Sequence, residues 1–260
     1  MKYYYRIYKE ILKTGFLKAI NFKVHSFSLI FSDVLFYAAV YGLWLSVLSH
    51  TDLIAGLTPN QMLFFISTNL LVDCIQMVFI TDAISSTVEK IKSGKFDFII
   101  LKPCNTLFLS LLSQFNAASV VNLVFTFSSF VYFWHRAGVG LVEGIGFILL
   151  LLFGFLIYIS LRILVASITF WTISSQYVWA AFWELIPLAE MPHRSLNKAA
   201  RFILLSFLPF GLIYSFPIYC LFEGFPLLMV SYLVLFSLGF SALTIWIWNL
   251  SIQRYCTASS

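Results

Sequence analysis

Apolar stretches long enough to cross a lipid bilayer recur along the whole chain, and short polar turns separate them. Only 10% of the 260 residues are charged, whereas about 25% are charged in an average soluble domain. So few charges cannot cover the surface of a soluble enzyme, and the 61% of apolar residues excludes a disordered chain. We therefore predict an all-α polytopic membrane protein with short loops.

The N-terminal segment has the period of an amphipathic helix. Between residues 3 and 20, apolar side chains such as Tyr4, Tyr8 and Ile11 share one face, and the basic residues lie largely off it. A basic amphipathic helix with aromatic residues is typical of a segment that lies in the membrane interface. We predict that residues 1–25 form such an interfacial helix in contact with membrane lipid, with a plain cytoplasmic tail as the alternative.

The rest of the chain, residues 26–260, is predicted to form one domain of six transmembrane helices. The first three spans are residues 26–49, 60–80 and 106–133, and the last span is residues 226–249. Residues 81–105, between the second and third spans, form the most polar internal stretch.

Two partitions of the region after residue 141 stay open. In the first, the fourth span runs to about residue 170 and buries Arg162, residues 171–198 form a cytoplasmic loop, and residues 199–222 form the fifth span. In the second, the fourth span stops near Leu161, residues 163–187 form the fifth span, and residues 188–225 form a re-entrant pair of short helices on the far side. We favour the second because an arginine in mid-membrane costs about 2.5–3.5 kcal/mol. In addition, Pro209 and Pro217 interrupt residues 199–222.

Basic residues predict the orientation. Ten of the 16 lysines and arginines lie in residues 2–23 and 90–102. With these stretches in the cytoplasm, the second partition places 12 basic residues inside and four outside, and the first places 14 inside and one outside. Both predict a cell (inner) membrane protein with cytoplasmic termini. The count itself favours the first partition.

Recognisable catalytic and nucleotide-binding motifs are missing from the sequence. The one Gly-Lys pair, Gly94-Lys95, is followed by Phe96, and the position five residues before Gly94 is Glu89, so the pattern of a phosphate-binding loop is not met. Cysteines and histidines are scattered without metal-ligand spacing. We expect no catalytic residues, no cofactor, no metal and no nucleic-acid partner.

Two polar features remain as candidate functional sites. Asn69, Asp73 and Gln76 lie at helical spacing inside the second span and are candidates for a polar pathway, or for the site of an ion- or proton-coupled carrier. In the loop, residues 82–92 have helical composition and Ser93-Gly94-Lys95 breaks the helix. A short amphipathic helix there suits docking of a soluble partner, and a solvated loop is the alternative.

This loop resembles a known family. The segment Ser93-Gly94-Lys95-Phe96-Asp97-Phe98-Ile99-Ile100-Leu101-Lys102-Pro103 is similar to the "SGxxDxxLLxP" segment of type-2 ABC transporter permeases, the membrane subunits of exporters related to antibiotic-resistance permeases. Downstream, Phe170-Trp171-Thr172, Phe182-Trp183-Glu184-Leu185, Pro192, the run from Arg201 to Phe210, Pro217 and Gly224 follow the C-terminal half of the same family.

The resemblance implies a permease without catalytic activity of its own. It implies that residues 1–25 are a connecting helix, that residues near 82–98 are a coupling helix touching a separate ATPase, and that residues 188–225 are the re-entrant element. The implied contacts with the ATPase are Asp82, Glu89, Lys90, Lys92, Gly94, Lys95 and Asp97. It also implies a homo- or heterodimer with a second permease, and ATP-driven export. A secondary carrier that uses Asp73, or a membrane scaffold without transport, is the competing hypothesis.

Overall fold

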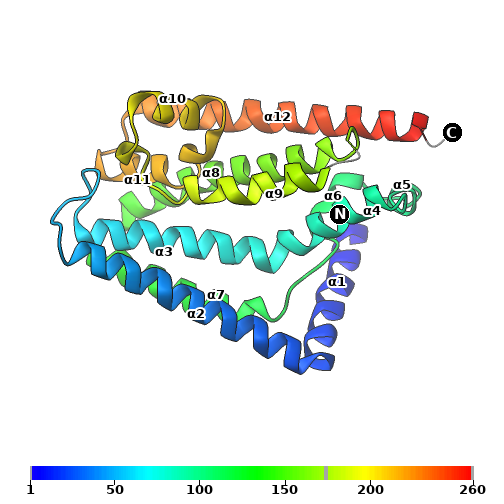
Figure 1. Cartoon of the computed structure of the whole chain (residues 1–260), viewed down its shortest axis with the longest axis horizontal. Helices are drawn as coiled ribbons and strands as arrows, with labels where there is room; N and C mark the ends of the chain where they lie inside the picture. Colours follow the sequence, from blue (N-terminus) through cyan, green and yellow to red (C-terminus); the bar gives the residue numbers. More distant parts are fainter. Residues whose placement is uncertain (1, 173–174, 259–260) are drawn as a thin grey trace. The chain divides into compact units, whose positions relative to one another are not determined.

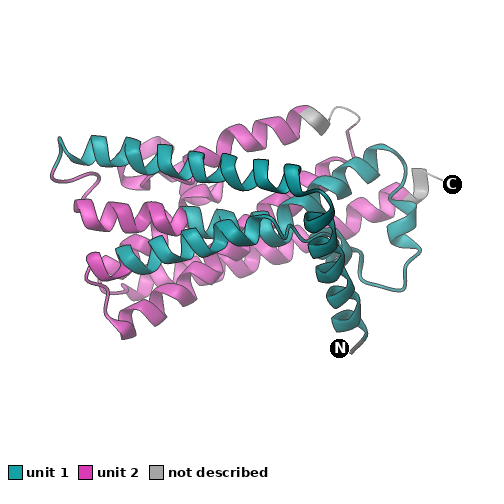
Figure 2. Cartoon of the chain, turned by 90° about the horizontal axis from the view of Figure 1, so that it is seen from below, with its two compact units in different colours: residues 1–51, 70–133 teal, residues 52–69, 134–260 magenta. Residues whose placement is uncertain are grey.

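The computed structural model describes residues 2–172 and 175–258 and is helical, without a named strand in those ranges (Figure 1). The chain divides into two compact units, each assembled from two stretches of sequence (Figure 2). Unit 1 contains residues 1–51 and 70–133, and unit 2 contains residues 52–69 and 134–260.

Unit 1 is built from helices at the N-terminus and in the middle of the chain. They are α1 (Lys2–Asn21), α2 (Lys23–Leu48), the second part of α3 (Pro59–Gln76), the π-helix η1 (Met77–Thr81), α4 (Asp82–Lys92), α5 (Asp97–Ile100), α6 (Thr106–Leu112) and most of α7 (Ser119–Arg136). α1 confirms the helix predicted within residues 3–20. It packs closely on residues 113–118, where a Cβ on Gly15 would overlap the backbone carbonyl of Phe115.

Unit 2 holds the first turns of α3 and everything after Phe133. Its elements are α8 (Leu141–Ile168), α9 (Ser175–Leu185), η2 (Ile186–Leu188), η3 (His193–Ser195), α10 (Lys198–Ser206), η4 (Pro209–Leu212), α11 (Ser215–Phe222) and α12 (Leu227–Ala258).

Within residues 2–172 and 175–258, four helices are long and apolar enough to cross a membrane, where six spans were predicted. They cover residues 23–48, 59–92, 141–168 and 227–255, and residues 177–188 form a shorter apolar helix. The predicted second span does not end at Ile80. It continues through η1 and α4 to Lys92, over 34 residues, which is about 51 Å of helix.

The predicted third span, residues 106–133, is not one helix. α6 ends at Leu112, residues 113–118 are irregular, and α7 begins at Ser119. Asn116 explains the break, because its backbone N–H donates to the carbonyl of Val78 at 3.0 Å and its side-chain oxygen accepts from the N–H of Ser119 at 3.3 Å. Such local bonds of an asparagine compete with a continuous helix.

The prediction that the fourth span stops near Leu161 is wrong. α8 continues to Ile168, and Arg162 is fully buried within it, as the first partition expected. The guanidinium lies 4.9 Å from the ring centroids of both Tyr158 and Trp183, and it donates to the Tyr158 hydroxyl at 3.1 Å. Aromatic faces attract a desolvated cation and offset part of its burial cost, so the helix does not need to end at this residue.

In residues 199–222, by contrast, the second partition is correct about the break. α10 ends at Ser206, Pro209 begins η4, and α11 follows with Pro217 in its first turn, where proline is tolerated. The first partition's cytoplasmic loop, residues 171–198, contains α9.

α8 and α12 run parallel within unit 2 (Figure 1). Ser160 lies opposite Ser241, with 3.0 Å between their hydroxyl oxygens, and Trp171 donates from its indole nitrogen to the hydroxyl of Ser251 at 2.8 Å. Because contacts advance in the same direction on both helices, residues 169–226 must run the opposite way. α9 runs in this opposite direction. Later in the same stretch, residue Ile213 packs on α8, where a Cβ on Gly154 would overlap the Ile213 carbonyl.

α2 and α7 are likewise parallel within unit 1. Asn122 donates to the Asp33 carboxylate at 2.6 Å, and Tyr41 donates to the Ser129 hydroxyl at 2.9 Å. The chain between α2 and α7 therefore also reverses direction once, through α3, η1 and α4.

Candidate functional site

The end of α4 is closed by a glycine motif that fixes the shape of the following turn. Gly94 has φ of 69°, its N–H donates to the Ile91 carbonyl at 3.3 Å, and the N–H of Lys95 donates to the Lys90 carbonyl at 2.8 Å. These two bonds form a Schellman motif, in which glycine adopts the left-handed conformation without a steric cost. The sequence Ser93-Gly94-Lys95 thus ends α4 as predicted.

Residues 89–102 form an exposed surface that we call the α4–α5 tip. Its exposed charged residues are Glu89, Lys92, Lys95, Asp97 and Lys102. Two large apolar side chains are exposed with them, Phe98 at 68% and Leu101 at 79%. The charge pattern of the sequence did not indicate these two. The signal was present in the run Phe98-Ile99-Ile100-Leu101, in which only Ile99 is buried.

The tip rests on a well-packed base. α4 buries Ala83, Ile84, Val88 and Ile91. Thr87 donates to the Ala83 carbonyl at 2.9 Å and also approaches the Ser110 carbonyl of α6 at 3.4 Å. Phe96, in the turn between α4 and α5, is completely buried. The exposed residues are therefore carried on a rigid support.

Two of the predicted contact residues do not belong to the exposed surface. Asp82 is the first residue of α4, at the end of the helix away from the tip. Its carboxylate accepts a hydrogen bond from the Asn116 side-chain amide at 3.2 Å. Lys90 is partly buried and supplies the carbonyl that Lys95 binds. Glu89, Lys92, Gly94, Lys95 and Asp97 are brought together at the tip.

The polar residues of α3 differ in their surroundings. Gln76 is fully buried in unit 1, directly before the π-turn η1, and its side-chain amide has no hydrogen-bond partner among the described residues. Asp73, also in unit 1, is partly buried. Asn69 belongs to unit 2, where its amide donates to the Glu190 carbonyl at 3.3 Å. Asn69, Asp73 and Gln76 thus differ in burial and in hydrogen bonding.

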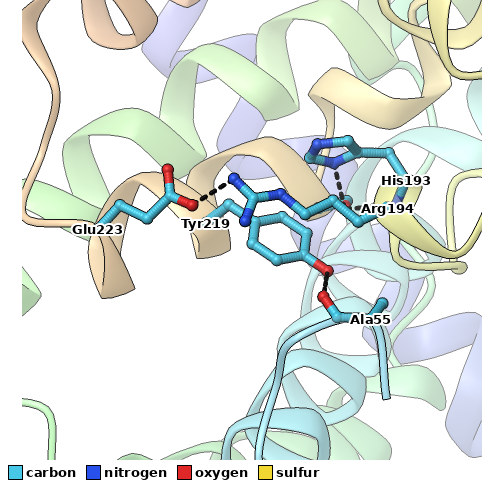
Figure 3. Close-up of polar contacts among 6 residues, drawn as sticks. Ala55, His193, Arg194, Tyr219 and Glu223 are labelled. Carbon is cyan, nitrogen blue, oxygen red and sulfur yellow. Dashed lines mark hydrogen bonds and ion pairs between the residues drawn. The ribbon is translucent and has the colours of Figure 1, made fainter. Parts of the chain in front are cut away.

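Unit 2 contains a polar network that the sequence pattern did not reveal (Figure 3). Arg194 forms an ion pair with Glu223 and lies over the ring of Tyr219, 4.1 Å from its centroid. The Tyr219 hydroxyl donates to the Ala55 carbonyl at 2.7 Å. We call these residues, with His193, the Arg194 network. Its members lie up to 168 positions apart, so no local spacing could predict it.

Ser215 fixes the position of His193 in this network. The backbone N–H of His193 donates to the Ser215 hydroxyl at 2.8 Å, and the imidazole Nδ1 lies 2.7 Å from the same oxygen. The His193 side chain is buried, and its ring packs edge-on against that of Tyr219 with 4.7 Å between the ring centroids. The histidine is therefore held inside the fold and suits a structural role.

No group of three or more potential metal ligands of the His, Cys, Asp or Glu type occurs within residues 2–172 and 175–258. In the comparison with known proteins, the sequence model of the ABC-2 family transporter proteins matches residues 34–259. The match covers most of the chain, including the α4–α5 tip and the Arg194 network. No curated protein and no solved structure matches the chain.

Proposed function

Since the chain belongs to the ABC-2 family of transporter proteins, we propose that it is the permease subunit of an ATP-driven exporter. The chain is a multi-pass membrane protein and the membrane component of an ABC transporter, and not an enzyme by itself. A separate ATPase supplies the energy, and a second permease, either a copy of this chain or a related one, completes the translocation pathway. The substrate is taken from the cytoplasm or from the cytoplasmic leaflet of the membrane and is exported.

The α4–α5 tip is the observation that carries this proposal. A loop that faces only water has no reason to expose Phe98 and Leu101 beside five charged residues. A partner that covers the tip would bury the two apolar side chains and pair with the charges around them. Because α4 continues α3 without a loop, a movement of the ATPase against the tip is transmitted to the membrane domain through one continuous helix.

The contacts with the ATPase come from the exposed residues of the tip. Glu89, Lys92, Lys95 and Asp97 provide charge complementarity, and Gly94 sets the shape of the turn. Lys90 and Asp82 act from behind this surface. Asp82 holds residues 113–118 through Asn116 and so supports the base on which the tip rests.

Six crossings are the topology that fits the helix directions. α7 runs parallel to α2, and α12 runs parallel to α8. The chain between the two helices of each pair must therefore cross the membrane once in the opposite direction. α3 supplies the first return. For the second, α9 is too short to span alone, and η2 with residues 188–225 completes it from the far side as a re-entrant element.

This topology keeps both termini in the cytoplasm. α1 then lies in the cytoplasmic interface with residues 1–25, and the tip projects on the same side. These two segments contain ten of the 16 lysines and arginines of the chain, in agreement with the positive-inside rule. α7 has 18 residues, about 27 Å of helix, which is close to the thickness of the hydrocarbon core.

Cysteine labelling tests the topology. In a cysteine-free background, Ser93→Cys at the tip should react with an impermeant maleimide only in permeabilised cells. Asp52→Cys in the turn between α2 and α3 should react in intact spheroplasts, since both residues are exposed. Labelling of Ser93→Cys in intact spheroplasts would overturn the orientation.

Vesicles test the energy source. Vesicles that contain this chain alone should show no uptake in response to a pH or ion gradient, whereas the chain purified with its ATPase should hydrolyse ATP. Gradient-driven uptake that is lost with Asp73→Asn would instead establish the secondary carrier. Activity in neither assay would leave the scaffold hypothesis.

A further inference from the structure

A large cavity lies entirely within unit 1, behind the amphipathic helix α1. Its volume is about 860 Å³, within the range of small-molecule sites. Residues of α1, the first turns of α2, Asp82 and the irregular segment 113–118 line it. None of the tip residues 89–102 takes part, so the cavity is separate from the proposed ATPase contact.

The walls of the cavity are mainly apolar, with charges at definite places. Ile7, Ile11 and Ala19 of α1 line it together with Phe115 and Ala117 of the irregular segment. Close packing of Gly15 on Phe115 fixes the distance between the two walls, because a Cβ there would overlap the Phe115 carbonyl. A cavity with long apolar walls suits an acyl chain better than a polar metabolite.

The cationic residues mark where a headgroup would bind. Arg6 and Lys18 both line the cavity, but twelve residues of helix, about 18 Å, separate them. Glu10, an acidic lining residue, lies one turn from Arg6 and two turns from Lys18. The other acidic lining residue, Asp82, already accepts a hydrogen bond from Asn116. Lys18 is therefore the cation best placed to bind an anion.

A second donor comes from the start of α2. Ser26 donates to the Ala19 carbonyl at 3.1 Å, which ties the first turn of α2 to the last turn of α1. This bend brings His25 to the same cavity as Lys18. An ammonium group and an imidazole N–H can together bind a phosphate. Ser113 also lines the cavity, and its shielded hydroxyl has no hydrogen-bond partner among the described residues.

We propose that this cavity holds one acidic phospholipid of the cytoplasmic leaflet, with its phosphate at Lys18 and His25 and the first part of its acyl chains between α1 and residues 113–118. The occupant is a lipid because the cavity joins a phosphate-binding end to apolar walls. An acidic lipid is favoured because α1 carries one acidic residue, Glu10, against Lys2, Arg6, Lys9, Lys13 and Lys18.

This inference rests on the proposed place of α1 at the membrane surface. Its test uses the isolated full-length chain in detergent and involves no ATPase, so it can fail while the permease proposal stands. Native mass spectrometry would count phosphatidylglycerol and phosphatidylcholine with identical acyl chains bound to the chain. We expect one phosphatidylglycerol per chain to be retained in preference to phosphatidylcholine.

Lys18→Gln should weaken phosphatidylglycerol binding by roughly tenfold, the order expected for one charge-assisted hydrogen bond, and leave phosphatidylcholine unchanged. Lys13→Gln is the matched control, because Lys13 is an exposed lysine of the same helix that does not line the cavity. It should change binding less than twofold. Ala19→Trp should fill the cavity and displace both lipids.

Three results would overturn the proposal. One is an equal loss of binding in Lys18→Gln and Lys13→Gln, which would indicate attraction to the helix surface as a whole. Another is binding of phosphatidylglycerol that neither lysine variant changes. The third is displacement of the lipid by excess inorganic phosphate, which would show a phosphate site without a lipid.

Discussion

The backbone N–H of Lys95 donates a 2.8 Å hydrogen bond to the carbonyl of Lys90, and this bond directs the chain out of α4 and into α5. It requires the left-handed conformation of Gly94 between them, with φ of 69°. The shape of the proposed docking surface thus depends on a residue that has no side chain to contact a partner.

Replacing Gly94 should therefore impair coupling without a clash. A Cβ at Gly94 would meet no atom within 4 Å. Gly94→Ala therefore lowers the free energy of unfolding only by the cost of a left-handed backbone at alanine, about 1 kcal/mol. We expect a reduction of several fold in the ATP hydrolysis stimulated by the permease, with a small fall in Tm. Gly239→Ala is the control, since Gly239 is helical and its Cβ would also be free, and it should be neutral or slightly stabilising.

The contact of Arg162 with Trp183 should appear in a double-mutant cycle. Trp183→Leu removes one of the two rings that the buried guanidinium faces and should lower stability by about 2 kcal/mol. In an Arg162→Met background the same change should cost clearly less, because no cation is left to desolvate. Chemical unfolding in detergent measures both. Equal costs in the two backgrounds would show that the ring acts only by packing.

Tyr219 should hold the turn that follows α2. Its hydroxyl donates to the Ala55 carbonyl, so Tyr219→Phe should cost about 1 kcal/mol and should speed hydrogen exchange of the Ile54 and Leu57 amides, which pair with each other. Tyr232→Phe loses a comparable bond, at 2.8 Å to the Leu205 carbonyl, and should leave exchange at residues 54–57 unchanged. The same exchange rate in both variants would exclude this role of Tyr219.

Local patterns in the sequence predicted the local parts of the structure. The amphipathic period predicted α1, the glycine after Lys92 predicted the end of α4, and Pro209 predicted the break after α10. Each of these depends on residues within a few positions of one another. The end of α8 was mispredicted because the cost of burying Arg162 is offset by Trp183, which lies 21 residues later.

Non-local contacts likewise explain the other differences. Asn116 interrupts the predicted third span through a bond to Val78, and the Arg194 network joins Ala55 to Tyr219. Among the tip residues, the family resemblance implied Glu89, Lys92, Lys95 and Asp97. The burial of Thr87 depends on its contact with Ser110 of α6, 23 residues later, and could not be predicted from composition.

The most direct test of the central claim is retention of the ATPase by the permease. The tagged chain would be purified from its native membrane, and ATP hydrolysis retained with it would be measured per mole of permease. Glu89→Lys combined with Phe98→Ser should lower retained hydrolysis at least tenfold at unchanged yield, because it reverses a charge and removes an exposed apolar contact of the tip. Asp52→Lys, which reverses an exposed charge in the turn between α2 and α3, should retain it fully. Full retention in the Glu89→Lys, Phe98→Ser variant would contradict docking of the ATPase at the α4–α5 tip.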